Sequence, residues 1–181
     1  ALYLIPGGVG GTEIYLRNLL AALARIDRRN QYIVYLNREA DAELCPAAAN
    51  FSVVETGVRA RFRPGRLLWE QTGMVRETRA AQLDELCSPG FTSPYLGRGA
   101  CVPVIHDLQH KRQPANFGWL ERRAWNFFVA MSVRRARRIV TVSESSKRDI
   151  VEYYGTPESR IEVVRHGVED AFFGLRENED Y

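Results

Sequence analysis

Short runs rich in β-branched and aromatic residues alternate along this chain with longer segments of helical periodicity. The β-rich runs are residues 32–36, 51–54, 83–87, 101–105, 139–142 and 161–164. The helical segments are residues 12–26, 67–83, 118–138 and 143–154. Parallel strands need a crossover connection between them, and that crossover is usually a helix. The alternation therefore predicts an α/β fold, a Rossmann-like parallel sheet flanked by helices.

The length of the chain predicts a single domain. A domain typically has about 150 residues, so the 181 residues are assigned to one unit, 1–175, followed by a polar tail, 176–181. A glycine loop that opens a helix normally follows a buried strand, yet only residues 2–5 precede the loop here. Part of the first strand is therefore expected to be missing. No segment approaches the roughly 18 apolar residues of a membrane span.

Charge and cysteine usage narrow the class of protein. The formal net charge is +3 at pH 7, a balance too mild to indicate a nucleic-acid partner by itself. Cys45, Cys87 and Cys101 contain no Cys-x-x-Cys pair, so they predict neither a disulfide framework nor a zinc site. Free thiols are typical of a reducing compartment, which favours a cytoplasmic protein.

A glycine-rich loop, residues 7–11, leads into the first helix with Thr12 as its predicted N-cap. Glycines let a backbone approach a ligand closely, and a helix N-terminus offers unpaired N–H groups, so the loop suits a phosphate. The dinucleotide pattern would need a third glycine at Glu13, and no Gly-Lys-Ser/Thr occurs. By itself the loop is also consistent with a simple tight turn.

Three other predicted strands are followed by candidate site residues. His106 and Asp107 follow the strand at 101–105, Ser143 follows the strand at 139–142 and caps the next helix, and Gly167 follows the last strand. Ligands of open α/β sheets bind beyond the carboxyl ends of the strands. The sequence therefore predicts one rim that gathers these residues with the glycine loop. His106 and His110 are four apart, but the strand before them and Pro114 disfavour the helix that a metal pair needs.

An arginine-rich helix is predicted at residues 119–138. It places Leu120, Ala124, Phe127, Phe128 and Met131 on one face, and its arginines cluster toward its C-terminal end. One interpretation is a packed helix with a solvated basic end that suits the helix dipole. The other is a peripheral contact with an anionic membrane surface or with a nucleic acid.

Taken together, the motifs resemble the N-terminal half of a family 4 glycosyltransferase of the GT-B type. The resemblance covers most of the chain and rests on residues 7–13, 68–71, 88–90, 104–108 with Pro114, 139–147 and 161–168. Cys87 stands where relatives often have histidine, and His166 stands where asparagine is more usual. Both departures are expected to affect the choice of acceptor.

The resemblance implies a retaining hexosyltransferase with two Rossmann-like domains. This chain would be the acceptor-binding domain, inactive without the C-terminal donor-binding domain, which is expected to be absent. The donor would be a nucleotide sugar, with GDP-mannose favoured, and the acceptor a glycan or a lipid-linked sugar. No permanently bound cofactor, no metal and no nucleic acid is expected. The resemblance is consistent with a cytoplasmic enzyme, peripheral at the inner face of a membrane.

The resemblance also implies roles for residues at the rim. His106 and Asp107 would line the reacting centre, and Ser143 and Gly167 would border the same cleft. The donor diphosphate would meet the glycine loop and the start of its helix, at Gly8, Gly10, Gly11 and Thr12. A Rossmann-type oxidoreductase that uses NAD or FAD remains the enzymatic alternative, because similar sheets serve both chemistries.

Overall fold

The computed structural model describes residues 11–96 and 100–167. In these residues β1 (Tyr32–Leu36) pairs with β2 (Phe51–Glu55). A second sheet has the order β3-β4-β5-β6, formed by β3 (Glu85–Ser88), β4 (Ala100–Ile105), β5 (Ile139–Thr141) and β6 (Ile161–Val163). All four pairings are parallel. The predicted α/β class with a parallel sheet is therefore confirmed.

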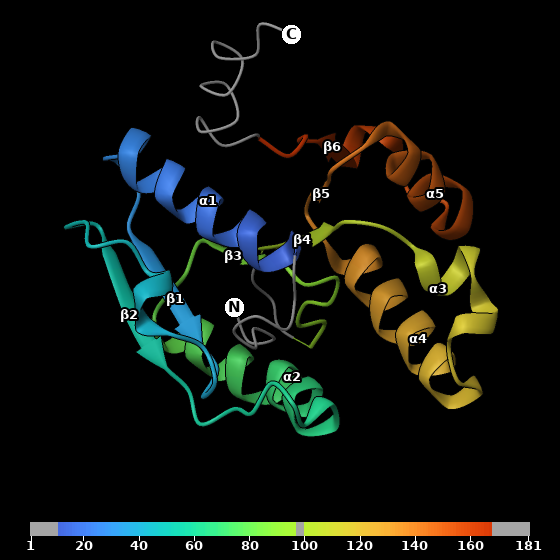
Figure 1. Ribbon diagram of the computed structural model, residues 1–181, viewed down its shortest axis with the longest axis horizontal. Coiled ribbons are helices and arrows are strands. Elements are labelled where there is room, and N and C mark those ends of the chain that lie inside the picture. The colour runs from blue at the N-terminus through green and yellow to red at the C-terminus, as the bar shows by residue number, and fades with distance from the viewer. Residues whose placement is uncertain (1–10, 97–99, 168–181) are drawn as a thin grey trace, which may run out of the picture.

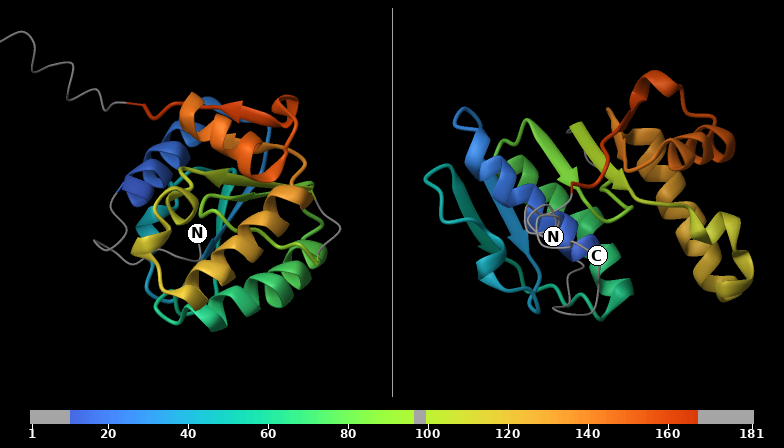
Figure 2. Two further views of the ribbon diagram at one scale, coloured as in Figure 1. Left: turned by 90° about the vertical axis from the view of Figure 1, so that its right-hand side faces the viewer. Right: turned by 45° about the horizontal axis from the view of Figure 1, so that its top comes forward.

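Helices cover both faces of the strands (Figure 1). They are α1 (Gly11–Ile26), α2 (Arg63–Ala80), the single turn α3 (Gln109–Arg112), α4 (Trp119–Arg135) and α5 (Glu144–Tyr154). Short 3-10 turns lie at η1 (Ala42–Leu44), η2 (Pro114–Asn116) and η3 (Glu158–Arg160). Figures 1 and 2 place α1 and α5 on one side of the strands and α2 and α4 on the other. This layering is that of a Rossmann-like domain.

Local chemistry explains where α5 begins and ends. The Ser143 hydroxyl accepts a hydrogen bond from the backbone N–H of Ser146 at 3.1 Å, which is the N-cap that the sequence predicts. At the other end Gly155 adopts a left-handed conformation with φ of 63°, which a residue without Cβ adopts at low cost. Both ends of this helix follow from residue types alone.

Two boundaries differ from the prediction. Thr12 was predicted to cap α1 but lies inside the helix, which already includes Gly11. The helix predicted from residue 67 begins at Arg63, with Pro64 in its first turn. Proline suits that position, because its φ is preset for a helix and its missing N–H has no helical partner there. The arginine-rich residues 59–66 are thus partly helical.

The main core lies between the four-stranded sheet and the helices α4 and α5. Its buried members are Ile105, Leu108, Val129, Val133, Ala136, Ile139, Ile150 and Ile161. A smaller core joins α1 to β1 through Leu16, Leu20, Val34, Leu36 and Leu44. Burial of each large aliphatic side chain contributes about 1.5–3 kcal/mol. Pro103 lies within β4 and is fully buried.

The apolar stripe predicted on the fourth helix is not its packed face. Leu120 is 72% exposed and Phe127 is 50% exposed, whereas Val129, Ser132 and Val133 are buried against the sheet. Two apolar stripes compete on α4, and helical spacing alone does not say which one meets the core. The arginines at its C-terminal end are exposed, as the packed-helix interpretation expects.

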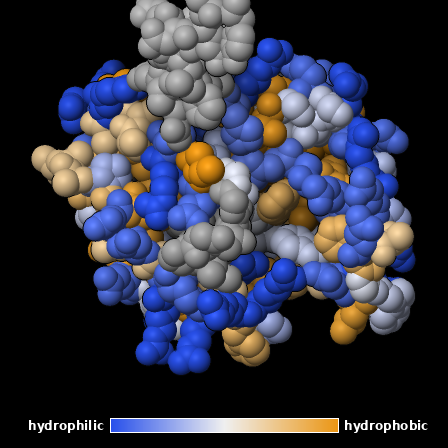
Figure 3. Space-filling view, viewed as in Figure 1, coloured by the Kyte–Doolittle hydropathy of each residue, from blue (hydrophilic) through white to orange (hydrophobic). Residues whose placement is uncertain are grey.

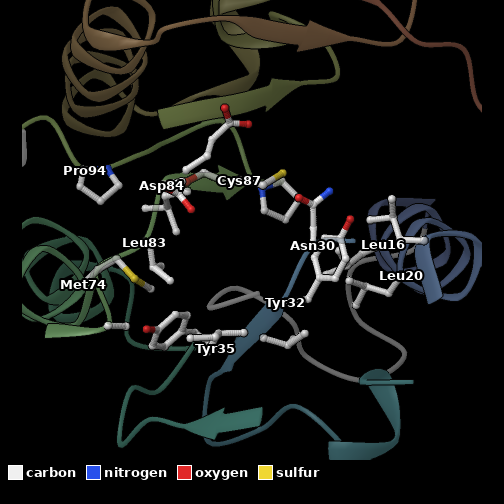
Figure 4. Close-up of a pocket in the computed structure, with 18 of the residues that line it drawn as sticks. Leu16, Leu20, Asn30, Tyr32, Tyr35, Met74, Leu83, Asp84, Cys87 and Pro94 are labelled. Atoms are coloured by element: carbon white, nitrogen blue, oxygen red, sulfur yellow. The ribbon is translucent and has the colours of Figure 1, made fainter. Parts of the chain in front are cut away.

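A cavity of about 850 Å³ lies between β1 and β3. Figure 4 shows side chains from both sheets and from two helices around it: Leu16, Leu20, Tyr32, Tyr35, Met74, Leu83 and Cys87. Among the described residues, β1 and β3 each pair with one strand only.

The expected first strand, residues 2–5, and the tail, residues 176–181, lie outside the described residues. No helix in the described part of the chain is long and apolar enough to cross a membrane.

Candidate functional site

Four aromatic rings from four separate segments meet at the carboxyl end of β4. His106 follows β4 directly, Tyr15 comes from α1, Phe91 from the loop after β3, and His166 from the segment after β6. The ring of Tyr15 stands edge-on to His106 at 5.1 Å and to His166 at 5.2 Å between centroids. The two imidazoles stack at 5.6 Å with planes 12° apart, and Phe91 lies 5.7 Å from His106. We call these four residues the ring cluster.

The imidazole of His106 is held by a backbone contact. Its Nε2 lies 3.3 Å from the carbonyl oxygen of Pro89. A carbonyl only accepts, so this contact places a proton on Nε2 and leaves Nδ1 as an acceptor. Burial holds the pKa of His106 below the ordinary value for histidine, and the nearby His166 lowers it further, against opposing effects of Pro89 and Asp107. The neutral form of the imidazole therefore predominates at pH 7.

The N-terminus of α5 is tied to the same strand end. The Ser146 hydroxyl, in the first turn of α5, donates to the backbone carbonyl of His106 at 2.8 Å and also lies 3.0 Å from the capping hydroxyl of Ser143. This pair of serines fixes the first turn of the helix beside His106. The unpaired N–H groups and the positive end of the helix dipole therefore lie next to the ring cluster.

The single turn α3, which follows His106, also contacts α5 through side-chain hydrogen bonds. The Arg112 guanidinium donates to both carboxylate oxygens of Asp149, at 2.6 and 2.5 Å. His110 lies 3.2 Å from the Tyr154 hydroxyl, and burial lowers the pKa of His110 to about 4. Asp149 is buried and its two oxygens match the planar guanidinium, a geometry that fixes orientation. These contacts hold the segment after β4 in a fixed position against α5.

Most of the predicted site residues that are described lie on this rim. Gly11 opens α1 one turn before Tyr15, Thr12 is half-buried in the same turn, and Gly167 follows His166. The carboxylate of Asp107 accepts from the backbone N–H of Gln109 at 3.2 Å, so it supports the start of α3. Gly8 and Gly10 lie outside the described residues. The functional roles of all these residues stay predictions.

Sequence reasoning did not identify Tyr15 and Phe91 as parts of this site. Tyr15 fits the apolar spacing of the first helix, which is typical of a residue packed in the core. It is half-buried instead, with its ring against both imidazoles, and burial raises the pKa of its hydroxyl. Phe91 has a positive φ of 66° in the loop after Pro89 and Gly90. No sequence pattern predicts a positive φ for a phenylalanine.

The cluster offers a defined set of contacts to a ligand. The aromatic rings present apolar faces, Nδ1 of His106 is an acceptor, and the α5 N-terminus presents backbone donors beside them. A site of this kind suits a polyhydroxyl compound next to an anionic group. Among the described residues, no group of three or more His, Cys, Asp or Glu side chains is arranged to hold a metal ion.

Comparison with known proteins agrees with the resemblance in the sequence. The sequence model of the family described as Glycosyltransferase Family 4 matches residues 9–172. The chain is also similar to the O-antigen chain mannosyltransferase RfbU of Salmonella typhimurium (strain LT2), with 28% identity over 97 residues. That match covers 53% of this chain and 26% of the relative. The matched span is therefore only about a quarter of the relative's length.

Proposed function

Since this chain belongs to glycosyltransferase family 4, we propose that it forms the acceptor-binding half of a retaining hexosyltransferase. The donor is a nucleotide sugar, with GDP-mannose favoured, and the acceptor is a glycan or a lipid-linked sugar. The preference for mannose is supported by the name of the Salmonella relative, a mannosyltransferase. Membership of this family removes the main support for the oxidoreductase alternative, which rested on the sheet architecture alone.

The convergence of segments at the end of β4 carries this proposal. Tyr15, His106 and His166 are far apart in the sequence, yet their rings lie 5.1 to 5.6 Å apart between centroids. They lie beside the capped N-terminus of α5. A sugar hydroxyl can donate to the free nitrogen of a neutral imidazole, while the helix N-terminus favours the developing negative charge of a departing diphosphate. Stabilisation of that charge is the main contribution a protein makes to such a transfer.

These groups suggest which steps of the transfer this chain supports and which depend on the donor. In the proposal, the start of α1 and Ser143 at α5 face the diphosphate of the donor, which is bound mainly by a second domain. His106 orients a hydroxyl at the reacting centre, and the departing phosphate takes the proton of the attacking hydroxyl. No nucleophile from the chain is required. Transfer with retention then gives an α-linked product from an α-linked donor, in the cytoplasm, and the 181-residue chain alone does not turn over.

Sugar transfer by the protein that contains both domains tests the proposal. The assay compares GDP-mannose with other nucleotide sugars and follows products on a lipid-linked acceptor. His106→Ala is expected to lower kcat by about 100-fold or more, because positioning and charge stabilisation at one site are worth several kcal/mol. Circular dichroism and thermal unfolding check that the variant is folded.

A variant three residues after His106, at the start of α3, provides the control. Gln109 is exposed, and Gln109→Ala is expected to retain near-normal turnover. Transfer with no donor would reject the enzyme function. Equal rates for the wild type and His106→Ala would remove His106 from the reacting centre and leave the family membership intact.

A further inference from the structure

Six large apolar side chains are exposed on adjacent parts of α2, α4 and the loop 92–96. They are Phe62, Leu68, Leu96, Trp119, Leu120 and Phe127, and we call them the α2/α4 patch. Trp119 is 65% exposed and Phe62 is 62% exposed. Single exposed apolar residues are common on proteins, whereas a group of this size marks an interaction surface.

Direct contacts join the segments that carry the patch. The Arg63 guanidinium, next to Phe62, pairs with the Glu121 carboxylate, next to Leu120, at 2.6 Å. This ion pair links the first turns of α2 and α4.

The loop 92–96 lies between the two helices. Gln71 of α2 accepts from the backbone N–H of Tyr95 at 2.8 Å. The ring of Tyr95 packs edge-on against Phe127 of α4 at 5.8 Å. The loop therefore bridges the middle of α2 and the middle of α4, and Leu96 lies next to the contact between Tyr95 and Phe127.

The charge around this surface is strongly positive. Segments 59–68 and 118–127 contain six arginines and one acidic residue, Glu121, which is paired with Arg63. Arg59, Arg61 and Arg123 are exposed. The Arg123 guanidinium lies over the Trp119 ring at 5.2 Å. Figure 3 shows apolar and strongly hydrophilic residues side by side in this region, at the lower right.

We propose that the α2/α4 patch docks on the surface of a bilayer that contains anionic lipids. Shallow insertion of Phe62, Trp119 and Leu120 removes apolar area from water, while the surrounding arginines meet lipid phosphates. A nucleic acid would use the arginines but leave the aliphatic side chains in water. An acidic protein partner would need carboxylates around an apolar centre. The experiment below distinguishes such a partner from a bilayer.

The position of the patch connects it with the proposed function, on which this step of the inference rests. In parallel α/β folds, the loops after the strands lead into the helix N-termini at the carboxyl edge of the sheet. The N-terminal ends of α2 and α4 therefore belong to the same edge as His106. An enzyme docked through this patch would meet a lipid-linked acceptor close to the membrane surface.

Vesicle binding tests the surface without donor or acceptor, so its outcome is independent of transfer activity. The purified protein is mixed with vesicles of equal parts phosphatidylglycerol and phosphatidylcholine, and with vesicles of phosphatidylcholine alone. Co-flotation is expected with the first and not with the second. Brominated acyl chains are expected to quench tryptophan fluorescence, and Trp119→Phe should remove most of that quenching.

Two pairs of substitutions separate the apolar and the basic contributions. The exposed pair Trp119→Ser with Leu120→Ser is expected to weaken binding by more than about tenfold. Arg59→Gln with Arg61→Gln is expected to weaken it by about fivefold for each arginine, which corresponds to about 1 kcal/mol each at an anionic surface. The control pair, Arg137→Gln with Arg138→Gln, removes equal charge just beyond the far end of α4 and is expected to bind normally.

Three results would overturn the proposal. One is absence of flotation with anionic vesicles while the protein is folded. Another is equal binding by the patch variants and the control pair. The third is capture by an acidic protein or by nucleic acid together with no vesicle binding, which would reassign the surface. In the protein that contains both domains, the patch variants should still transfer sugar to a water-soluble acceptor, which distinguishes a failure of docking from a failure of the enzyme.

Discussion

At the scale of single residues, Glu70 is a buried acidic side chain whose pKa is raised by its surroundings. It is buried in α2, where its carboxyl accepts from the Thr92 hydroxyl at 2.9 Å and from the Gln71 amide at 3.0 Å. Burial raises its pKa from the ordinary 4.5 to about 7, although both hydrogen bonds and Arg66 oppose the rise. The folded protein therefore binds this proton more tightly than the unfolded chain does.

We predict that Glu70→Gln removes a pH dependence of stability. In the wild type, the free energy of unfolding should fall as pH rises from 4.5 to about 7, because the unfolded state loses the Glu70 proton first. The fall attributable to Glu70 is about 3 kcal/mol, since a tenfold change in proton affinity is about 1.4 kcal/mol. Urea unfolding across that pH range measures it. An equal fall in the Gln variant would assign the effect to other groups.

At the scale of elements, the start of α5 links stability to the site. Ser143 caps the helix, and Ser146 joins its first turn to the carbonyl of His106. Ser143→Ala is expected to lower the free energy of unfolding by about 1 kcal/mol, because one helix N–H loses its acceptor. Chemical denaturation measures this loss. Ser159→Ala changes an exposed serine and should stay within about 0.5 kcal/mol of the wild type; similar losses in both variants would contradict a capping role.

At the scale of the whole molecule, the ring cluster couples segments that are separated by most of the chain. His106 and His166 stack, and the charge of His166 helps to lower the pKa of His106, after burial as the main cause. His166→Asn is therefore expected to raise the pKa of His106 toward that of a free histidine. NMR titration of the imidazole signals measures it, with the buried His110 as an internal reference. An unchanged His106 titration would show that the two rings are not coupled.

The sequence by itself determined the order of the elements, the parallel sheet and both ends of α5. These follow from short-range chemistry, namely side-chain period, capping hydroxyls and the glycine that ends a helix. It also placed His106, Ser143 and Gly167 at strand ends, because loops after parallel strands emerge at one edge. The family resemblance rested on the same local motifs, and the match over residues 9–172 confirms it.

Only the tertiary structure decided which of two apolar stripes on α4 meets the core. It brought Tyr15 and Phe91 to His106, and it joined the N-terminal ends of α2 and α4 through the Arg63–Glu121 pair. These arrangements depend on contacts between residues distant in the chain. Helical spacing fixes which side chains share a face but not what that face packs against, and the choice between core, site and exposed surface is made by the packing of the whole domain.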